Sequence, residues 1–289
     1  STLYQVPLLL EKEGLCAVVC RKLGLGSGVP DMTEWQAMVE KILGAHRRVE
    51  IALVGKYTGL HDAYLSVAES LFHAGTACDA KVDIRWVDSE TLTEENAAQM
   101  LAGCGGVLVP GGFGDRGIEG MIAAARYARE NRVPYLGICL GMQIAVIEFA
   151  RHVAGWDDAD STEFTTRTAH PVIDLMPEQV GVTAKGGTMR LGRYPCVLAE
   201  GSRARAAYGT AEVFERHRHR YEFNNQFRTE LEEAGLRLSG LSPDRQLVEI
   251  VEEPGHPWFV GCQFHPEFLS RPDRPHPLFW GFVAAALEK

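Results

Sequence analysis

The segment Gly137–Gly141 could present a reactive sulfur to a substrate. It reads GICLG and stands where an apolar run of strand length gives way to a helical pattern. A Gly-x-nucleophile-x-Gly turn requires small residues, because a Cβ on either side would collide with neighbouring backbone. Such a turn places the sulfur over a helix N-terminus, where unpaired N–H groups and the helix dipole favour the thiolate. Cys139 is therefore a candidate nucleophile for attack on a carbonyl carbon.

Two other segments could supply the proton carrier and the oxyanion donors that such an attack requires. FHPEF (264–268) follows a predicted strand and sets His265 and Glu267 two residues apart, on one side of an extended chain, where the carboxylate could orient the imidazole. PGGFG (110–114) follows another predicted strand, and its glycines would let backbone N–H groups approach a bound carbonyl. Loops at the carboxyl ends of strands meet in one crevice of an open α/β sheet, so we expect the three segments to lie together.

Each of these features also has a plainer interpretation. A cysteine in a strand-to-helix turn is often a buried small hydrophobic residue, His-Pro-Glu is often a turn, and PGGFG alone is a loop. We favour the chemical interpretation because three pieces of the required types all stand at predicted strand ends.

From Val49 onward the hydrophobic pattern predicts strands alternating with helices. The predicted strands are 49–55, 82–88, 105–110 and 133–138, and the predicted helices are 62–75, 93–103, 118–130 and 140–150. Asp62 is predicted to cap the first helix and Gly75 to end it. Repeated βαβα units indicate an α/β fold with a mostly parallel sheet and helices on both faces.

The two ends of the chain lack this regular alternation of strand and helix patterns. After about residue 155 we predict a polar loop at 157–168, strands at 187–192, 246–252 and 259–264 that add antiparallel edges to the sheet, and a closing helix at 277–289. Residues 1–48 combine a helix-like stretch, a Gly-rich break and a helix at 31–43. We therefore divide the chain into a lead-in or linker, 1–48, and a main domain, 49–289.

The composition excludes several classes of protein. A formal charge of −9 argues against nucleic-acid binding, which needs clustered excess Lys and Arg. No run approaches the roughly 20 apolar residues that span a bilayer, and the first thirty residues lack the pattern of a secretory signal. The seven cysteines form an odd set without a Cys-x-x-Cys pair, which suits reduced thiols. We expect a cytoplasmic protein that binds neither nucleic acid nor membrane.

GICLGMQ and FHPEF, in that order and 126 residues apart (265 − 139), resemble the class I, or triad, glutamine amidotransferases. This resemblance implies a Rossmann-like α/β fold. It also implies an enzyme that hydrolyses glutamine to glutamate and ammonia through a γ-glutamyl thioester. It would make Cys139 the nucleophile, His265 the proton shuttle and Glu267 the orienting carboxylate. The backbone of Gly112 and Leu140 would form the oxyanion hole.

Longer segments resemble the glutaminase domain of the CTP synthase family over nearly the whole of 49–289. They are VGKYTGLHDAYLSV, VPGGFGDRGIEGMI, STEF, GGTMRLG, RHRHRYEFNN and HPWFVGCQFHPEF. The residues that would contact glutamine by this resemblance are Gly112, Leu140, Gly141, Met142, Gln143, Glu163 and Arg220. Glu163 can meet the α-ammonium and Arg220 the α-carboxylate of the substrate. One basic face of an exposed strand remains the plainer interpretation for at least one of Arg216, Arg218 and Arg220.

The resemblance also implies partners. In that family the ammonia passes through a tunnel to a synthetase domain, which uses ATP and Mg²⁺ to activate UTP and forms CTP in pyrimidine biosynthesis. Only TLYQVPLLLEKEGL (2–15) resembles the end of that domain, so we expect one part of a longer glutamine-hydrolysing ligase, with no cofactor in this chain. GTP would be an allosteric activator of the full enzyme, which would be a homotetramer.

Other interpretations compete with a glutaminase. The domain could be a largely inactive docking or regulatory module that depends on its partner, or a related γ-glutamyl cysteine hydrolase. His217 and His219 could suggest a metal site, but the interleaved arginines disfavour a divalent cation and no carboxylate or cysteine set accompanies them. GLGSG (24–28) lacks the Gly-Lys-Ser/Thr ending of a phosphate loop, and we expect a flexible connection. We assign no role to 176–185.

Overall fold

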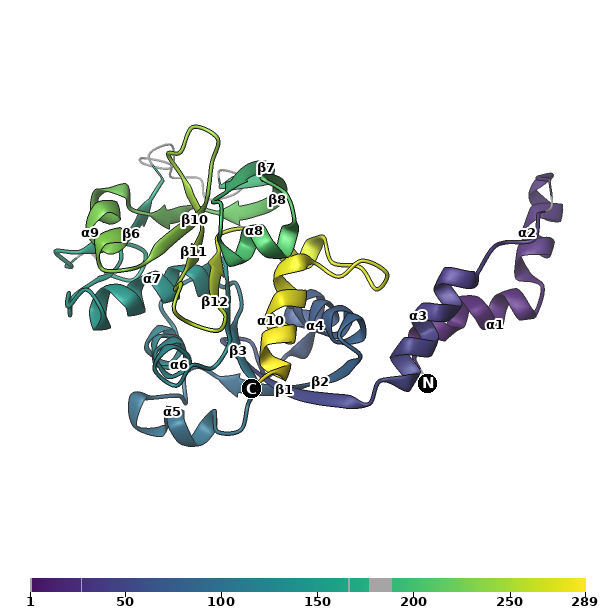
Figure 1. The fold of residues 1–289 in the computed structure, drawn as a ribbon, viewed down its shortest axis with the longest axis horizontal. Helices are drawn as coiled ribbons and strands as arrows, with labels where there is room; N and C mark the ends of the chain where they lie inside the picture. Colours follow the sequence, from purple (N-terminus) through teal and green to yellow (C-terminus); the bar gives the residue numbers. More distant parts are fainter. Residues whose placement is uncertain (1, 27, 166, 177–188) are drawn as a thin grey trace.

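A large twisted sheet with helices on both faces forms the centre of the computed structural model, which describes residues 2–26, 28–165, 167–176 and 189–289 (Figure 1). In these described ranges the sheet has nine strands in the order β2-β1-β3-β4-β12-β11-β10-β7-β8. Its first five strands run parallel: β2 (Ala80–Asp88), β1 (Arg47–Gly55), β3 (Gly106–Val109), β4 (Tyr135–Ile138) and β12 (Phe259–Cys262). The predicted α/β class is confirmed.

The second half of the sheet is antiparallel, as predicted for the C-terminal part of the chain. It consists of β11 (Val248–Glu252), β10 (Arg237–Leu241), β7 (Arg190–Leu198) and β8 (Glu212–His219). A smaller sheet joins β5 (Asp160–Ser161), β6 (Pro171–Leu175) and β9 (Tyr221–Phe223). Part of the predicted strand 187–192 and nearly all of 176–185 lie outside the described residues.

The helices bury the two faces of the sheet in separate hydrophobic cores. One core packs α5 (Glu94–Met100), α6 (Ile118–Glu130), α7 (Leu140–His152) and α9 (Arg228–Glu233), and the other packs α4 (Leu65–Ala77), α8 (Arg203–Tyr208) and α10 (Pro277–Leu287). Strand β1 serves both: Ala52 and Val54 belong to the first core, whereas Ile51 and Leu53 belong to the second. This two-sided burial explains why the centre of the strand, residues 51–54, is continuously apolar.

The predicted cap of α4 is wrong. Asp62 lies in a short 3-10 helix, His61–Tyr64, and α4 begins only at Leu65 and continues past Gly75 to Ala77. The tight turn brings the Tyr64 hydroxyl to the end of β1, where it accepts the backbone N–H of Lys56 at 3.1 Å. A tertiary hydrogen bond therefore overrides the local capping signal.

The N-terminal segment projects from the body of the molecule (Figure 1). It contains a 3-10 turn (Leu3–Gln5) and the helices α1 (Val6–Lys12), α2 (Leu15–Leu23) and α3 (Thr33–Gly44). Tyr4 fastens it to α4, because its ring stacks on Phe72 at 5.8 Å and its hydroxyl donates to Glu69 at 2.9 Å. Strand β1 begins at Arg47 and so crosses the predicted boundary between residues 48 and 49. The division into a linker and a main domain stays a prediction.

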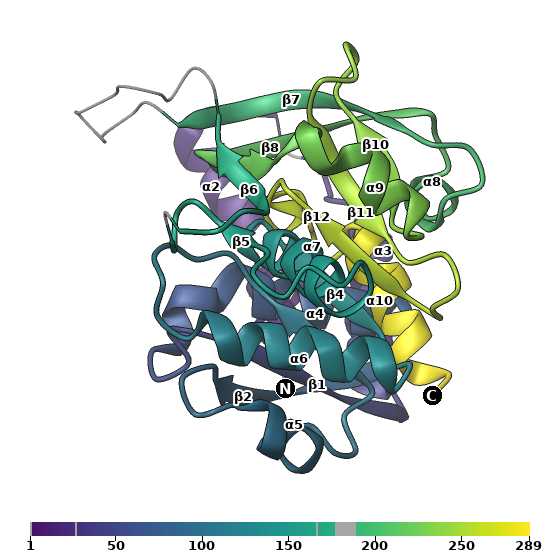
Figure 2. The ribbon, with the colours of Figure 1, turned by 90° about the vertical axis from the view of Figure 1, so that its left-hand side faces the viewer.

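In the part of the chain that the structure describes, no helix has both the length and the apolar character needed to cross a membrane. Viewed from the side, α7 lies across the centre of the sheet, and its first turn meets the carboxyl ends of β3 and β4 (Figure 2). This edge of the sheet carries the candidate site.

Candidate active site

Cys139 stands in a sharp turn between β4 and α7. Its φ of 52° and ψ of −100° lie in a region that residues with side chains rarely adopt. Such a conformation costs about 1–3 kcal/mol and persists only where the surroundings hold it. Here the Cys139 N–H donates to the carbonyl of Cys262 on β12 at 2.7 Å. The turn predicted from GICLG is therefore present, with the cysteine at the N-cap of α7.

The glycines on either side are required by close backbone contacts. A Cβ on Gly137 would lie 2.4 Å from the carbonyl oxygen of Gly141, and a Cβ on Gly141 would lie 2.1 Å from that of Val109 on β3. Neither contact is tolerable, so a side chain at either position would force the backbone to move. The two glycines let the first turn of α7 rest directly on β3 and β4.

We expect Gly141→Ala to lower the free energy of unfolding by about 1–3 kcal/mol, because the added methyl overpacks the contact with β3. Denaturant unfolding followed by circular dichroism measures the change. Gly59→Ala is the matched control, since a Cβ there meets no atom within 4 Å. Equal stabilities of the two variants would contradict the close approach at the elbow.

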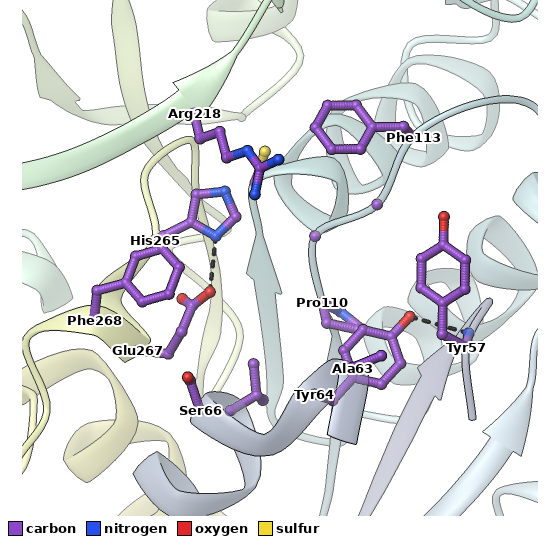
Figure 3. A pocket seen from close by; sticks show the side chains of 14 residues that line it. Tyr57, Ala63, Tyr64, Ser66, Pro110, Phe113, Arg218, His265, Glu267 and Phe268 are labelled. Carbon is purple, nitrogen blue, oxygen red and sulfur yellow. Dashed lines mark hydrogen bonds and ion pairs between the residues drawn. The ribbon is translucent and has the colours of Figure 1, made fainter. Parts of the chain in front are cut away.

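His265 and Glu267 emerge from the end of β12, beside the cysteine. Strand β12 pairs with β4 so that Cys262 lies opposite Ile138. His265 Nδ1 is 2.7 Å from Glu267 Oε1 (Figure 3). The imidazole and carboxyl side chains are only 13% and 7% exposed, which strengthens the interaction between them. The predicted pairing of these two side chains is therefore present in the structure.

His265 also faces Cys139. A Cβ on Gly111 would lie 2.9 Å from His265 Cε1 and 3.6 Å from Cys139 Cβ, so both groups flank this glycine. Burial disfavours the charged imidazole, but Cys139 and Glu267 outweigh it and raise the pKa of His265 to about 10. The proton then rests on His265 at neutral pH. An imidazolium can stabilise a neighbouring thiolate and later protonate a leaving amine.

A cavity of about 270 Å³ opens in front of the sulfur (Figure 3). Its walls come from the end of β1, the loop after β3, the start of α4, β8 and the segment after β12, and they include Tyr57, Tyr64, Gly111, Gly112, Phe113, Cys139, Arg218, His265 and Phe268. Phe268 stacks on the His265 ring with centroids 5.4 Å apart. A carbonyl group bound here would have the sulfur and the loop glycines as neighbours.

A smaller recess reaches Cys139 from another side. It is lined by Gly112, Phe113, Cys139, Gln143, Glu163, His219, Arg220 and Tyr221. Glu163 and Arg220 bring opposite charges to one recess, an arrangement that suits a ligand carrying both an ammonium and a carboxylate group. Oxygen Oε1 of Glu163 accepts the N–H of Gly114 at 2.9 Å, which fixes the carboxylate against the Gly-rich loop.

The other residues predicted to contact substrate are placed differently. Gln143 is buried, and its amide donates to the carbonyl of Tyr221 at 3.0 Å and to Oε1 of Gln263 at 3.2 Å. Met142 packs into the core against Gly261, so only its backbone can face a ligand. The first amides of α7, at Leu140 and Gly141, are not used by the helix ladder and are available to an anion.

Two residues of the site had no role in the sequence interpretation. Gln263 donates its side-chain amide to Cys139 Sγ at 3.6 Å, and Arg218 lines the large cavity beside His265. A polar residue directly after a buried strand was the signal for Gln263. Strand β8 buries Glu215, His217 and His219, so its arginines face outward. The sequence indicated a basic face on this strand. That Arg218 of this face lines the cavity depends on how distant segments pack, which the sequence does not show.

Comparisons with known proteins agree with this geometry. The family described as "Glutamine amidotransferase class-I" matches residues 60–285. Because this match covers most of the chain, the chain belongs to the class I glutamine amidotransferase family. The matched residues include the cysteine turn and the histidine–glutamate pair described above.

Within that family, the chain is similar to CTP synthases. It is 60% identical over 288 residues to CTP synthase of Chloroflexus aurantiacus, covering 100% of this chain and 53% of the relative. It is 58% identical over 289 residues to that of Geobacillus kaustophilus, covering 100% and 54%. The chain thus spans about half the length of the curated relatives it matches.

A solved structure gives the same result for the fold. The Trypanosoma brucei CTPS glutaminase domain with bound acivicin is 42% identical, with a TM-score of 0.78, and the match covers 83% of this chain and 94% of that one. The fold is therefore that of a CTP synthase glutaminase domain.

Proposed function

We propose that this chain hydrolyses L-glutamine to glutamate and ammonia through a γ-glutamyl thioester on Cys139. One observation carries the proposal: the strained turn at Cys139 and the buried His265–Glu267 pair open into the same cavity. The related glutaminase domain has bound acivicin, a small electrophilic amino acid, which supports a glutamine site in this chain.

In the first half of the reaction, the Cys139 sulfur attacks the side-chain amide carbon of glutamine. The carbonyl π electrons move to oxygen, and the resulting oxyanion is stabilised by backbone N–H groups at Gly112 and Leu140. The tetrahedral intermediate collapses as the C–N bond breaks. His265 gives its proton to the departing nitrogen, which leaves as ammonia, and the γ-glutamyl group remains on sulfur as a thioester.

In the second half, water cleaves the thioester. Neutral His265 takes a proton from the water as its oxygen attacks the acyl carbon, and the same two N–H groups stabilise the second oxyanion. The C–S bond breaks, glutamate leaves, and the Cys139–His265 pair regains its starting protonation. Glu267 keeps the imidazole oriented through both halves.

Substrate recognition uses the polar recess. Glu163 receives the α-ammonium and Arg220 the α-carboxylate of glutamine, while Gln143 lines the recess and is held by its hydrogen bond to the Tyr221 carbonyl. The main-chain groups of Gly141 and Met142 complete the contact at the start of α7. The amino-acid end of glutamine would thus lie in the recess, with its side-chain amide in the cavity in front of Cys139.

The ammonia would serve a second reaction in a longer enzyme. Because the relatives are named CTP synthases and are about twice as long, a synthetase half that uses ATP and Mg²⁺ to convert UTP to CTP is the proposed partner. Activation by GTP, assembly of the full enzyme into a homotetramer, and a cytoplasmic location stay predictions.

Electrophilic labelling tests the proposed function directly. We expect the chain, incubated with acivicin, to gain a single adduct on Cys139 by peptide mass spectrometry, and excess glutamine to protect it. Glutamate release from glutamine is measured in parallel. Label on Cys78 or Cys262 in place of Cys139 would contradict the assignment.

The same experiment separates the alternatives. A docking module without chemistry of its own takes up no label at Cys139, even when the synthetase half is supplied. A γ-glutamyl peptidase is labelled but prefers γ-glutamyl peptides to glutamine. A glutaminase that needs its partner is labelled slowly alone and faster in the full-length enzyme.

A further inference from the structure

A buried lysine lies behind the glutamine recess. Lys56 directly follows β1 and is only 4% exposed. Its Nζ donates to the carbonyl oxygen of Phe113 at 3.0 Å and to that of Gly114. Both carbonyls belong to the Gly-rich loop after β3. The ammonium group therefore fastens this loop to the end of the neighbouring strand.

One peptide group connects this lysine to Glu163. The carbonyl of the Phe113–Gly114 peptide accepts from Lys56, and the N–H of the same peptide donates to Glu163 Oε1 at 2.9 Å. The bond is trans, so its C=O and N–H point in opposite directions from one rigid plane. Whatever fixes the carbonyl therefore fixes the N–H, and with it the carboxylate.

The electrostatics support this connection. Desolvation lowers the pKa of Lys56 to about 8, while Glu163 and Asp115 act to raise it and Arg116 to lower it. A cation aligned with the C=O end of a peptide polarises the N–H at the other end, which strengthens its hydrogen bond to an anion. Burial of an ammonium is unfavourable unless it is well satisfied, and both of its bonds go to this loop.

We propose that Lys56 is a positioning residue for substrate recognition, which holds the Glu163 carboxylate through the Phe113–Gly114 peptide in the orientation that receives the α-ammonium of glutamine. The inference rests on the proposed function. A positioning role differs from that of a purely structural tether. Loss of a structural tether would affect all substrates alike, whereas loss of a positioning residue for Glu163 would affect substrates with an α-ammonium group most.

Comparison of two substrates tests the inference. Glutaramate is glutamine without its α-amino group, so it offers nothing to Glu163. We expect Lys56→Met to lower kcat/KM for glutamine by roughly tenfold to a hundredfold, the scale for losing a hydrogen bond to a charged group, and that for glutaramate much less. The preference for glutamine over glutaramate should thus fall by about tenfold or more.

A double-mutant cycle supplies the second readout. Glu163→Gln removes the carboxylate, so adding Lys56→Met to it should change the preference no further. Lys81→Met is the matched control, because Lys81 is an exposed lysine on β2. Thermal unfolding checks that each variant is folded at the assay temperature. Lys56→Leu, which also removes the donor group, replaces Lys56→Met if the latter does not fold.

The outcomes separate the two hypotheses. An active wild-type chain whose preference is unchanged in the Lys56 variant, or whose two substitutions add independently, overturns the positioning role and leaves the glutaminase intact. A wild-type chain that neither releases glutamate nor takes up acivicin overturns the proposed function and the inference together.

Discussion

Replacing Cys139 with alanine should lower glutamine-dependent glutamate release by roughly five to six orders of magnitude, the scale seen when a nucleophile is removed from a triad. The substitution removes the atom that would carry the γ-glutamyl group, and water alone cannot use the cavity as efficiently. The backbone conformation at this position is no less accessible to alanine than to cysteine, so we expect the variant to fold. Glutamate release coupled to a dehydrogenase assay measures the loss.

Cys262→Ala is the matched control for this experiment. Its sulfur is fully buried on the strand beside β4 and, among the described residues, donates to the carbonyl of Phe264 at 3.6 Å. The Cys262 carbonyl that holds the Cys139 N–H survives the substitution. We expect near-normal activity and no loss of acivicin labelling. A Cys139→Ala chain that releases glutamate at the parent rate would refute the thioester mechanism.

The second large effect concerns the carboxylate behind the histidine. We expect Glu267→Gln to lower kcat by about 10²–10⁴, because a neutral amide can offer its NH₂ group to Nδ1 and hold the imidazole in the wrong tautomer. KM for glutamine should change little, since Glu267 lines the cavity behind His265 and not the polar recess. Steady-state kinetics separate the two constants.

The pH dependence gives this variant a distinct signature. Glu267 is one of the groups that raise the pKa of His265 to about 10, so its neutralisation lowers that pKa. Imidazolium then deprotonates at lower pH, and the alkaline limb of the kcat profile moves toward neutrality. Glu40→Gln, an isosteric change on the exposed face of α3, should leave the profile alone. An unshifted alkaline limb in Glu267→Gln would show that Glu267 does not control the protonation of His265.

The parallel half of the fold could be predicted because its strands are buried on both faces. Runs such as 51–54 and 133–138 are continuously apolar, and each is followed by a Gly-containing turn and a helical period. Strands β6 and β10 were missed: both are short, and each pairs on one side with a strand distant in the chain, β6 with β9 and β10 with β7. Their hydrogen-bond partners, rather than their own residues, make them strands.

The candidate site divides in the same way. Cys139, His265 and Glu267 each stand in a local motif, and their geometry follows from the turn and the strand that carry them. The roles inferred for Lys56 and Gln263 depend on atoms of other segments, namely two loop carbonyls and the Cys139 sulfur. Residue spacing along the chain does not predict such contacts. A single polar residue at the end of a buried strand is nevertheless a candidate for them.

The position of β12 in the middle of the sheet has a consequence for how the chain folds. It fills the place between β4 and β11, and its Cys262 carbonyl ties down the strained turn at Cys139. Pairing β4 with β12 closes a loop of more than a hundred residues, an entropic cost that makes such a contact form late. Until β12 docks, the elbow lacks its tether and the sulfur lacks its base. A nascent or misfolded chain would therefore carry an ordinary thiol, and glutaminase activity would report completion of the sheet.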